Sequence, residues 1–116
     1  MGWRLCGATI LDKETLLSCA HCFENGYLIV QAEVGFKNHR TSPQKLNVRS
    51  VEMHPEYNGR NLNNDLSILK LSFPLNWTES VRPACLPDVS FTPEENSQMG
   101  FVSGWGVTRW VPSYGK

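Results

Sequence analysis

The sequence predicts an all-β protein, arranged as a barrel or a sandwich, and three observations point to this class. Short segments rich in aliphatic, β-branched and aromatic residues recur along the 116 residues. Clusters of turn-forming residues separate these segments at roughly regular spacing. No segment keeps the apolar periodicity of a long helix. The length suits one domain that is large enough to bury a core.

The first half of the chain predicts three strands. The apolar runs GATILD (residues 7–12) and ETLLSCA (14–20) meet at a polar turn and indicate a hairpin. The next strand is YLIVQAEVGF (27–36), which is rich in β-branched and aromatic residues. Between the hairpin and this strand, AHCFEN (20–25) has room for one helical turn. The polar stretch KNHRTSPQK (37–45) contains a proline and is expected to be a loop.

Residues 46–107 predict two further strands, a connector and a final strand. LNVRSVEMH (46–54) alternates apolar and polar residues until the pattern shifts at Ser50, which indicates a bulge or a change of face. LSILKLSF (66–73) is predicted to be a largely buried strand with apolar residues at both ends. The stretch 74–98 contains four prolines and little periodicity, so we expect a connector. MGFVSGWGV (99–107) is the final predicted strand.

The composition excludes several classes of protein. Hydrophobic residues make up 41% of the chain and charged residues 19%, which is typical of a globular protein rather than a disordered one. The formal net charge is zero and no basic stripe is present, so nucleic acid is not an expected partner. No apolar run approaches the roughly 20 residues that span a bilayer. The N-terminal residues MGWRLCGATI lack the pattern of a secretory signal, so we expect no signal peptide in this chain.

The segment LLSCAHC (16–22) admits three interpretations. A Cys-x-x-Cys pair is typical of redox dithiols, but these are best supported near a βαβ pattern, which this sequence does not show. The same pair would supply half of a zinc site, but no second closely spaced pair of ligands follows it. In the third interpretation, Cys6 and Cys22 flank the predicted hairpin and are joined by a disulfide, because adjacent strands bring such residues within reach.

The third interpretation gives His21 a chemical role. A disulfide at Cys22 would hold the loop just after His21, and an imidazole whose pKa lies near neutrality is suited to take up and return a proton. The second ring nitrogen then needs a carboxylate to set the tautomer. Asp65 is the candidate, because NNDLSILKL (63–71) puts this acid at the mouth of a buried strand.

Several motifs resemble, in order, those of the trypsin/chymotrypsin-like serine protease family. CGATILDKETLLSCAHC (6–22) is similar to the family's C-G-G/A-T/S-L-I…L-T-A-A-H-C segment. HPEYN (54–58) is similar to its H-P-x-Y-N, and NNDLSILKL (63–71) to its N-x-D-I-A-L-L-K-L. VRPACLP (81–87) and VSGWG (102–106) resemble two further signatures. The resemblance runs from about Leu5 to about Thr108 and covers nearly the whole chain.

The resemblance implies both a fold and a reaction. The fold would be an antiparallel Greek-key β-barrel, the first barrel of a two-barrel protease. Residues 1–74 would form this barrel, 75–98 the inter-barrel connector and 99–116 the first strand of the second barrel. The intact protein would be a serine-type endopeptidase that hydrolyses peptide bonds of protein or peptide substrates. His21 would be the general base and acid, and Asp65 its orienting carboxylate.

The resemblance also implies particular cysteine chemistry and a location. It implies a disulfide between Cys6 and Cys22, and pairing of Cys85 outside the matched region, with a regulatory chain or another domain. It implies a secreted or extracellular protein without a cofactor. In that compartment the sequon that begins at Asn76 would be a candidate N-glycosylation site.

The departures from the family pattern concern the rest of the active site. The family's I-V-G-G start, its G-D-S-G-G nucleophile motif and its specificity-pocket segments do not occur in these 116 residues. We therefore expect this chain by itself to be an incomplete protease domain that lacks the nucleophile and the second barrel, without peptidase activity. The alternative is a non-catalytic protease homologue that acts as a binding or decoy module.

Three further positions have less specific readings. Cys19 replaces the family's usual small residue two positions before the histidine and is expected to be a buried thiol that acts as a small hydrophobe. The alternative for Cys19 is a mispaired or intermolecular disulfide. His39 and His54 are expected to be solvated or structural. The family's calcium loop would fall around 33–44, where Glu33 is the only acidic residue, so we predict no metal site.

Overall fold

The computed structural model describes residues 6–27, 29–35, 44–92 and 99–104, and the chain divides into two units, Met1–Leu86 and Pro87–Lys116. All regular structure in the described residues is β-strand, which confirms the predicted class. None of the described segments forms a helix, so this part of the chain has no helix that could cross a membrane. Residues 20–25, where the sequence leaves room for one helical turn, form a series of turns, in which the Phe23 amide donates to the Ala20 carbonyl at 2.9 Å.

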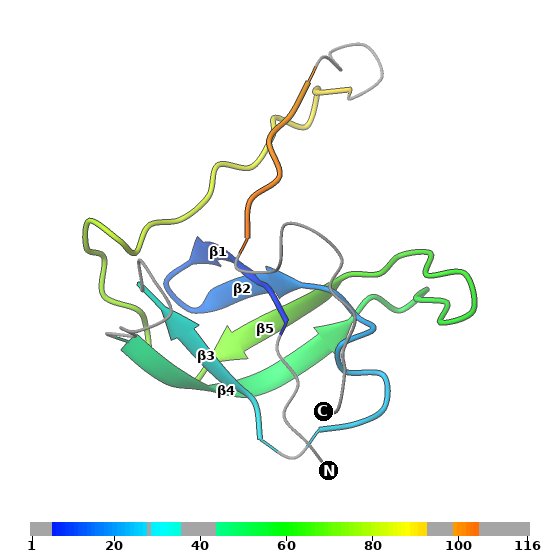
Figure 1. The fold of residues 1–116 in the computed structure, drawn as a ribbon, viewed down its shortest axis with the longest axis horizontal. Coiled ribbons are helices and arrows are strands. Elements are labelled where there is room, and N and C mark those ends of the chain that lie inside the picture. Colours follow the sequence, from blue (N-terminus) through cyan, green and yellow to red (C-terminus); the bar gives the residue numbers. More distant parts are fainter. Residues whose placement is uncertain (1–5, 28, 36–43, 93–98, 105–116) are drawn as a thin grey trace, which may run out of the picture. The chain divides into compact units, whose positions relative to one another are not determined.

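The first unit contains one antiparallel sheet that curls into a half-barrel (Figure 1). Its strands are β1 (Thr9–Asp12), β2 (Thr15–Ser18), β3 (Gln31–Val34), β4 (Gln44–Met53) and β5 (Ser67–Leu71). The order in the sheet is β1-β2-β5-β4-β3. Three consecutive strands therefore lie side by side, and the long β2–β3 connection lets β2 pair with β5. This is the arrangement of a Greek key.

The hairpin predicted at the start of the chain forms as β1 and β2, with Ile10 opposite Leu16. The Asp12 carboxylate accepts a hydrogen bond from the Glu14 amide at 2.8 Å, which closes the turn. Strand β2 then pairs with β5, so that Leu16 faces Leu69 across the ladder. This second pairing places β2, which precedes the β3–β4 hairpin in the sequence, beside β5, which follows it.

The irregular pattern in the fourth predicted strand has a structural counterpart. The register between β4 and β5 shifts between Val48 and Ser50, next to the position where the alternation of apolar residues breaks.

Two strands differ in their bounds from the sequence prediction. Strand β4 begins at Gln44, inside the stretch predicted to be a loop. Strand β3 is shorter than its predicted range of 27–36 and is followed by Gly35, whose positive φ of 81° turns the backbone out of the strand.

The core lies on one face of the curled sheet. It consists of Leu16, Ala20, Cys22, Phe23, Val34, Leu69, Leu71, Leu75 and Val81. In β5 the inward side chains are Ser67, Leu69 and Leu71, because alternate residues of a strand point to opposite faces. Leu66 and Phe73, the apolar ends of this segment, are exposed, so burial is limited to the strand itself.

Two residues of the stretch predicted to be a connector belong to the core of the first unit. Leu75 and Val81 are each only 1% exposed and pack in the core. The Leu75 amide donates to the Lys13 carbonyl and the Ala84 amide to the Ile10 carbonyl, both at 2.8 Å. These contacts attach the aperiodic stretch to β1 and its turn, and the unit runs to Leu86.

The second unit is described only over residues 87–92 and 99–104. A turn forms where the Phe91 amide donates to the Asp88 carbonyl at 2.9 Å. Residues 99–104 of the predicted final strand are in no strand, and its continuation to 116 lies outside the described residues. A strand requires a partner for its ladder of hydrogen bonds, and within the described segments none pairs with 99–104.

Candidate active site

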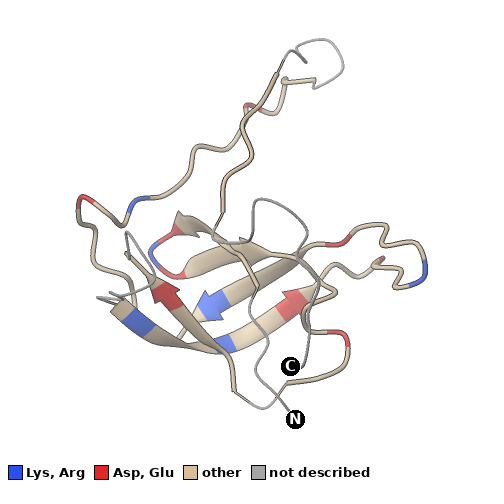
Figure 2. Ribbon diagram, viewed as in Figure 1, with Lys and Arg blue, Asp and Glu red and all other residues tan. Residues whose placement is uncertain are grey.

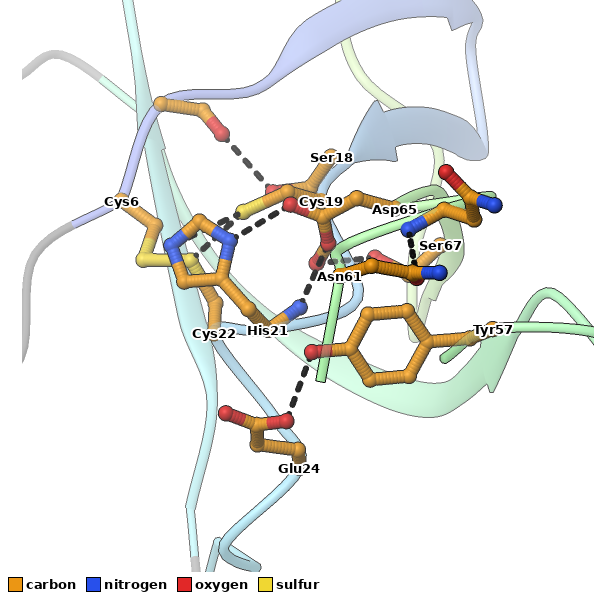
Figure 3. A network of polar contacts seen from close by, with 12 residues as sticks. Cys6, Ser18, Cys19, His21, Cys22, Glu24, Tyr57, Asn61, Asp65 and Ser67 are labelled. Carbon is orange, nitrogen blue, oxygen red and sulfur yellow. Dashed lines mark hydrogen bonds and ion pairs between the residues drawn. A yellow bond between two sulfur atoms is a disulfide. The ribbon is translucent and has the colours of Figure 1, made fainter. Parts of the chain in front are cut away.

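His21 and Asp65, which are 44 residues apart in the sequence, are in direct contact (Figure 3). His21 Nδ1 lies 2.7 Å from Asp65 Oδ2, and the His21 backbone amide donates to Oδ1 at 2.8 Å. An ionised carboxylate only accepts hydrogen bonds, so Nδ1 carries the proton in this contact. The neutral ring then has its lone pair on Nε2, which is the atom a general base uses.

The position of His21 is set by the residues on either side of it. Ala20 is fully buried and Cys22 is 8% exposed, whereas the His21 side chain is 49% exposed. The backbone of Cys19 is attached to β5, because the buried Ser67 hydroxyl donates to the Cys19 carbonyl at 2.8 Å. The loop is therefore held on both sides of His21 while the ring itself reaches solvent.

Asp65 lies at the end of a loop that is closed by its own hydrogen bonds. The His54 amide donates to the Leu66 carbonyl at 2.9 Å, and the Asn64 side-chain amide to the Glu56 carbonyl at 3.1 Å. Asn64 has a positive φ of 58°, a backbone conformation that asparagine tolerates better than most residues. This turn brings Asp65, two residues before β5, against the His21 loop.

Tyr57 and Glu24 join the two loops a second time, and the sequence did not reveal this contact. The Tyr57 hydroxyl donates to Glu24 Oε2 at 2.6 Å (Figure 3). This hydrogen bond to a carboxylate raises the pKa of Tyr57 to about 12. Tyr57 belongs to the HPEYN motif, but its partner is 33 residues away and has no local signal that identifies it.

The environment of Asp65 favours its ionised form. The hydrogen bond from the His21 ring is the largest influence and lowers the pKa of Asp65. Partial burial opposes this effect, and hydrogen bonds from the His21 and Ala20 amides add to it. The side chain is 21% exposed, so its charge is not fully screened by water. Asp65 is therefore suited to stabilise a positively charged imidazole at its side.

A disulfide joins Cys6 and Cys22 next to His21. Cys19 is a free thiol, and its Sγ lies 2.9 Å from Cys22 Sγ and 3.9 Å from His21 Nε2. The sequence predicts a buried thiol at this position, but Cys19 is only partly buried because it follows the end of β2, beside the exposed ring of His21. Three sulfur atoms therefore lie close together, and one of them, Cys19 Sγ, lies beside the imidazole.

Cys85 and Asn76 are two further residues singled out from the sequence. Cys85 is a free, exposed cysteine. Asn76 is exposed, and its backbone makes two hydrogen bonds with the Gln44 side chain, at 2.9 and 3.1 Å. Neither residue takes part in the two hydrogen bonds between His21 and Asp65.

Two groups of side chains in the described residues bring metal-ligand atoms together. One group contains Cys6, Cys19 and Cys22, and the other contains Cys19, His21 and Asp65.

Of the segment 33–44, which corresponds to the family's calcium loop, the structure describes only residues 33–35 and Gln44. There the Glu33 carboxylate lies 3.7 Å from Lys45 Nζ, an exposed pair of opposite charges. Figure 2 shows acidic and basic residues interspersed over the strands and loops.

Comparison with known proteins identifies the family. The sequence model of the trypsin family matches residues 2–112. Transmembrane protease serine 9 of Rattus norvegicus is 39% identical over 105 residues, 87% of this chain and 10% of that protein. Ovochymase of Halocynthia roretzi is 34% identical over 108 residues, 89% of this chain and 7% of that protein. Trypsin-1 of Gadus morhua is 30% identical over 107 residues, 92% of this chain and 43% of that protein.

The similarity covers most of this chain but only part of each relative. The chain spans between 7% and 43% of the lengths of these three proteins. The family match includes both loops of the site and all five strands. On this evidence, together with the all-β sheet, the chain belongs to the trypsin family.

Proposed function

We propose that this chain supplies the general base and its orienting carboxylate to a serine-type endopeptidase whose nucleophile lies outside these 116 residues. The observation that carries the proposal is the double contact between His21 and Asp65, from Nδ1 at 2.7 Å and from the backbone amide at 2.8 Å. Such a pair holds one tautomer of histidine in one orientation. The chain belongs to the trypsin family, and in serine proteases a histidine held by an aspartate in this way is the general base.

In the proposed reaction, His21 Nε2 accepts the proton of a serine hydroxyl as the serine oxygen attacks the peptide carbonyl. The imidazolium that forms is stabilised by Asp65, whose lowered pKa keeps it ionised. The same nitrogen then returns the proton to the departing amine. Asp65 itself gains no proton during the cycle. Proteins or peptides are the substrates in this proposal, bound between this sheet and a second barrel.

The Cys6–Cys22 disulfide supports an extracellular or secretory location, because disulfides persist in oxidising compartments. In that setting Asn76 is a proposed glycosylation site, since its sequon is present and the residue is exposed. The exposed, free Cys85 is a proposed attachment point for a regulatory chain. Mass analysis of the native, secreted protein tests both modifications.

The experiment that tests the function begins with the transcript beyond the codon for Lys116. An in-frame G-D-S-G-G motif would allow the whole protease domain to be expressed, activated and assayed on peptide substrates. We expect His21→Ala and Asp65→Asn to lower kcat by about 10³- to 10⁴-fold or more, because the base or its tautomer is lost. Asp88→Asn, which changes an acidic residue outside both loops of the site, is the matched control and should retain activity. Equal activity of the wild-type and His21→Ala enzymes would refute the proposal.

A non-catalytic binding module is the second candidate function. A reading frame that ends close to Lys116 in every transcript would support this candidate over the protease. The purified chain would then have to unfold in one cooperative thermal transition as a monomer. A molten, aggregating product would count against it.

A further inference from the structure

The cluster beside the active-site histidine contains a thiol that the proposed proteolytic mechanism does not use. Cys19 Sγ lies 3.9 Å from His21 Nε2, and Cys19 is a free cysteine. The two residues are separated by one position in the loop that follows β2, and Ser67 attaches the Cys19 backbone to β5 at 2.8 Å. The sulfur and the nitrogen are therefore held on the same side of a fixed loop.

We propose that Cys19 and His21 form a binding site for a borderline-soft divalent cation, of which Zn²⁺ is the best fit. Zinc bonds of about 2.3 Å to sulfur and about 2.1 Å to nitrogen together span up to about 4.4 Å. One ion therefore contacts both Cys19 Sγ and His21 Nε2 across their separation of 3.9 Å. A thiolate and an imidazole are the ligands that select zinc over magnesium or calcium.

Asp65 orients the nitrogen ligand in this site. Its carboxylate contacts His21 Nδ1 at 2.7 Å, so the proton resides on Nδ1 and the lone pair of Nε2 is directed away from the acid. Metal-binding histidines commonly have a carboxylate on their other nitrogen, which fixes the ring and raises its basicity. Asp65 is thus a positioning residue here, and it does not itself coordinate the ion.

The disulfide determines how many sulfurs take part. Cys6 and Cys22 are bonded to each other and are poor metal ligands, although their sulfurs lie within the same cluster as Cys19. The oxidised chain therefore offers one thiol, which loses its proton to solvent when the ion binds, and one imidazole. Water or a substrate group fills the remaining positions, because the His21 side chain is 49% exposed.

Zinc at this position has a consequence for catalysis that rests on the proposed function. The ion would occupy the Nε2 lone pair that a general base needs, so zinc binding and proton transfer exclude each other. A protease containing this loop would be inhibited reversibly by zinc and restored by a chelator. The binding itself does not depend on peptidase activity, so it is measured apart from any enzyme assay, on protein whose fold and Cys6–Cys22 disulfide have first been verified.

The first experiment measures binding of Zn²⁺ to the oxidised chain in competition with a chromophoric chelator. We expect Asp65→Asn to weaken binding by about 10- to 100-fold. Cys19→Ser and His21→Gln, which remove a direct ligand, should weaken it further. Cys85→Ser is the matched control, because Cys85 is the other free thiol and belongs to neither ligand group, and its variant should bind as the wild type does. Disulfide mapping and circular dichroism check the fold of each variant.

The second experiment needs no variant. In the folded wild-type chain, Zn²⁺ should slow alkylation of Cys19 several-fold and leave alkylation of Cys85 unchanged. Co²⁺ in place of zinc should produce thiolate-to-metal charge-transfer absorption. Equal alkylation rates with and without zinc would overturn the proposal. Binding that appears only after Cys6–Cys22 is reduced would also overturn it, since that would indicate a site made of several thiolates.

Discussion

The two loops that carry His21 and Asp65 are held in opposite ways. The Asp65 loop, residues 54–66, is closed by its own groups: the Asn58 amide donates to the Asn63 carbonyl at 3.0 Å, and the Asn58 side chain accepts from the Arg60 amide at 2.9 Å. The His21 loop, residues 19–27, is held mainly by groups from elsewhere in the chain. Among these are the disulfide partner Cys6, the carboxylate of Asp65, the hydroxyl of Ser67 and the phenol of Tyr57.

This difference has a consequence for stability. A loop closed by turn chemistry keeps its shape through local hydrogen bonds, whereas a loop held by distant groups depends on each tertiary contact. We therefore expect changes outside the His21 loop to loosen it while the Asp65 loop keeps its structure. Amide hydrogen exchange of the two loops, measured in each variant, tests this comparison directly.

Removal of the disulfide should have the largest effect on stability. Cys6 and Cys22 are separated by 16 residues, and a bridge that closes a loop of this size stabilises a protein by about 3 kcal/mol. The double variant Cys6→Ser, Cys22→Ser should lower the free energy of unfolding in urea by about that amount. Exchange should quicken over 19–27 and change little over 54–66. Cys85→Ser is the control, and an equal loss of stability in that variant would contradict the prediction.

Loss of the Ser67 hydroxyl should have the next largest effect. Ser67 is 1% exposed and donates to the Cys19 carbonyl at 2.8 Å, so Ser67→Ala leaves a carbonyl near the core without its partner. We expect the free energy of unfolding to fall by about 1–3 kcal/mol. Ser90→Ala, in an exposed position, should change it by less than about 0.5 kcal/mol. Similar urea midpoints for both variants would show that the contact does not stabilise the loop.

The pKa of Asp65 predicts an acid-dependent part of the stability. This pKa is lowered in the folded chain, mainly by the hydrogen bond from His21. The resulting stabilisation is present above the unfolded pKa of about 3.9 and is lost as the pH falls through the lower, folded value. Urea midpoints measured from pH 6 down to 2 should therefore fall less for Asp65→Asn than for the wild type. Asp88→Asn is the control and should follow the wild-type curve.

The pKa of Tyr57 predicts a smaller effect at alkaline pH. Its pKa is raised to about 12, so the neutral phenol stabilises the fold below the unfolded pKa of about 10. This contribution is lost as the pH rises from about 10 to 12. Absorbance titration should reveal one tyrosine that ionises late in the wild type and is missing in Tyr57→Phe. If Tyr27→Phe rather than Tyr57→Phe removed that step, the contact with Glu24 would not be its cause.

Local patterns in the sequence were sufficient for much of the fold. The apolar runs predicted the hairpin of β1 and β2, and the broken alternation around Ser50 corresponds to the shift in register between β4 and β5. Family motifs pointed to His21 and Asp65, which the structure brings into contact. The aperiodic stretch after β5 was less informative, because a single leucine or valine such as Leu75 or Val81 has no pattern that distinguishes a core residue from an exposed one.

The sequence by itself determined the β class, the main strands and the residue types at the site. These depend on short-range properties: side-chain alternation, turn chemistry and the order of motifs. Only the tertiary structure decided that Ser67 holds Cys19, that Tyr57 reaches Glu24, and that a thiol lies 3.9 Å from His21 Nε2. The first two contacts join residues 48 and 33 positions apart, and the third depends on how one loop is turned. No local pattern encodes such distances, because they arise when the curled sheet brings separate loops together.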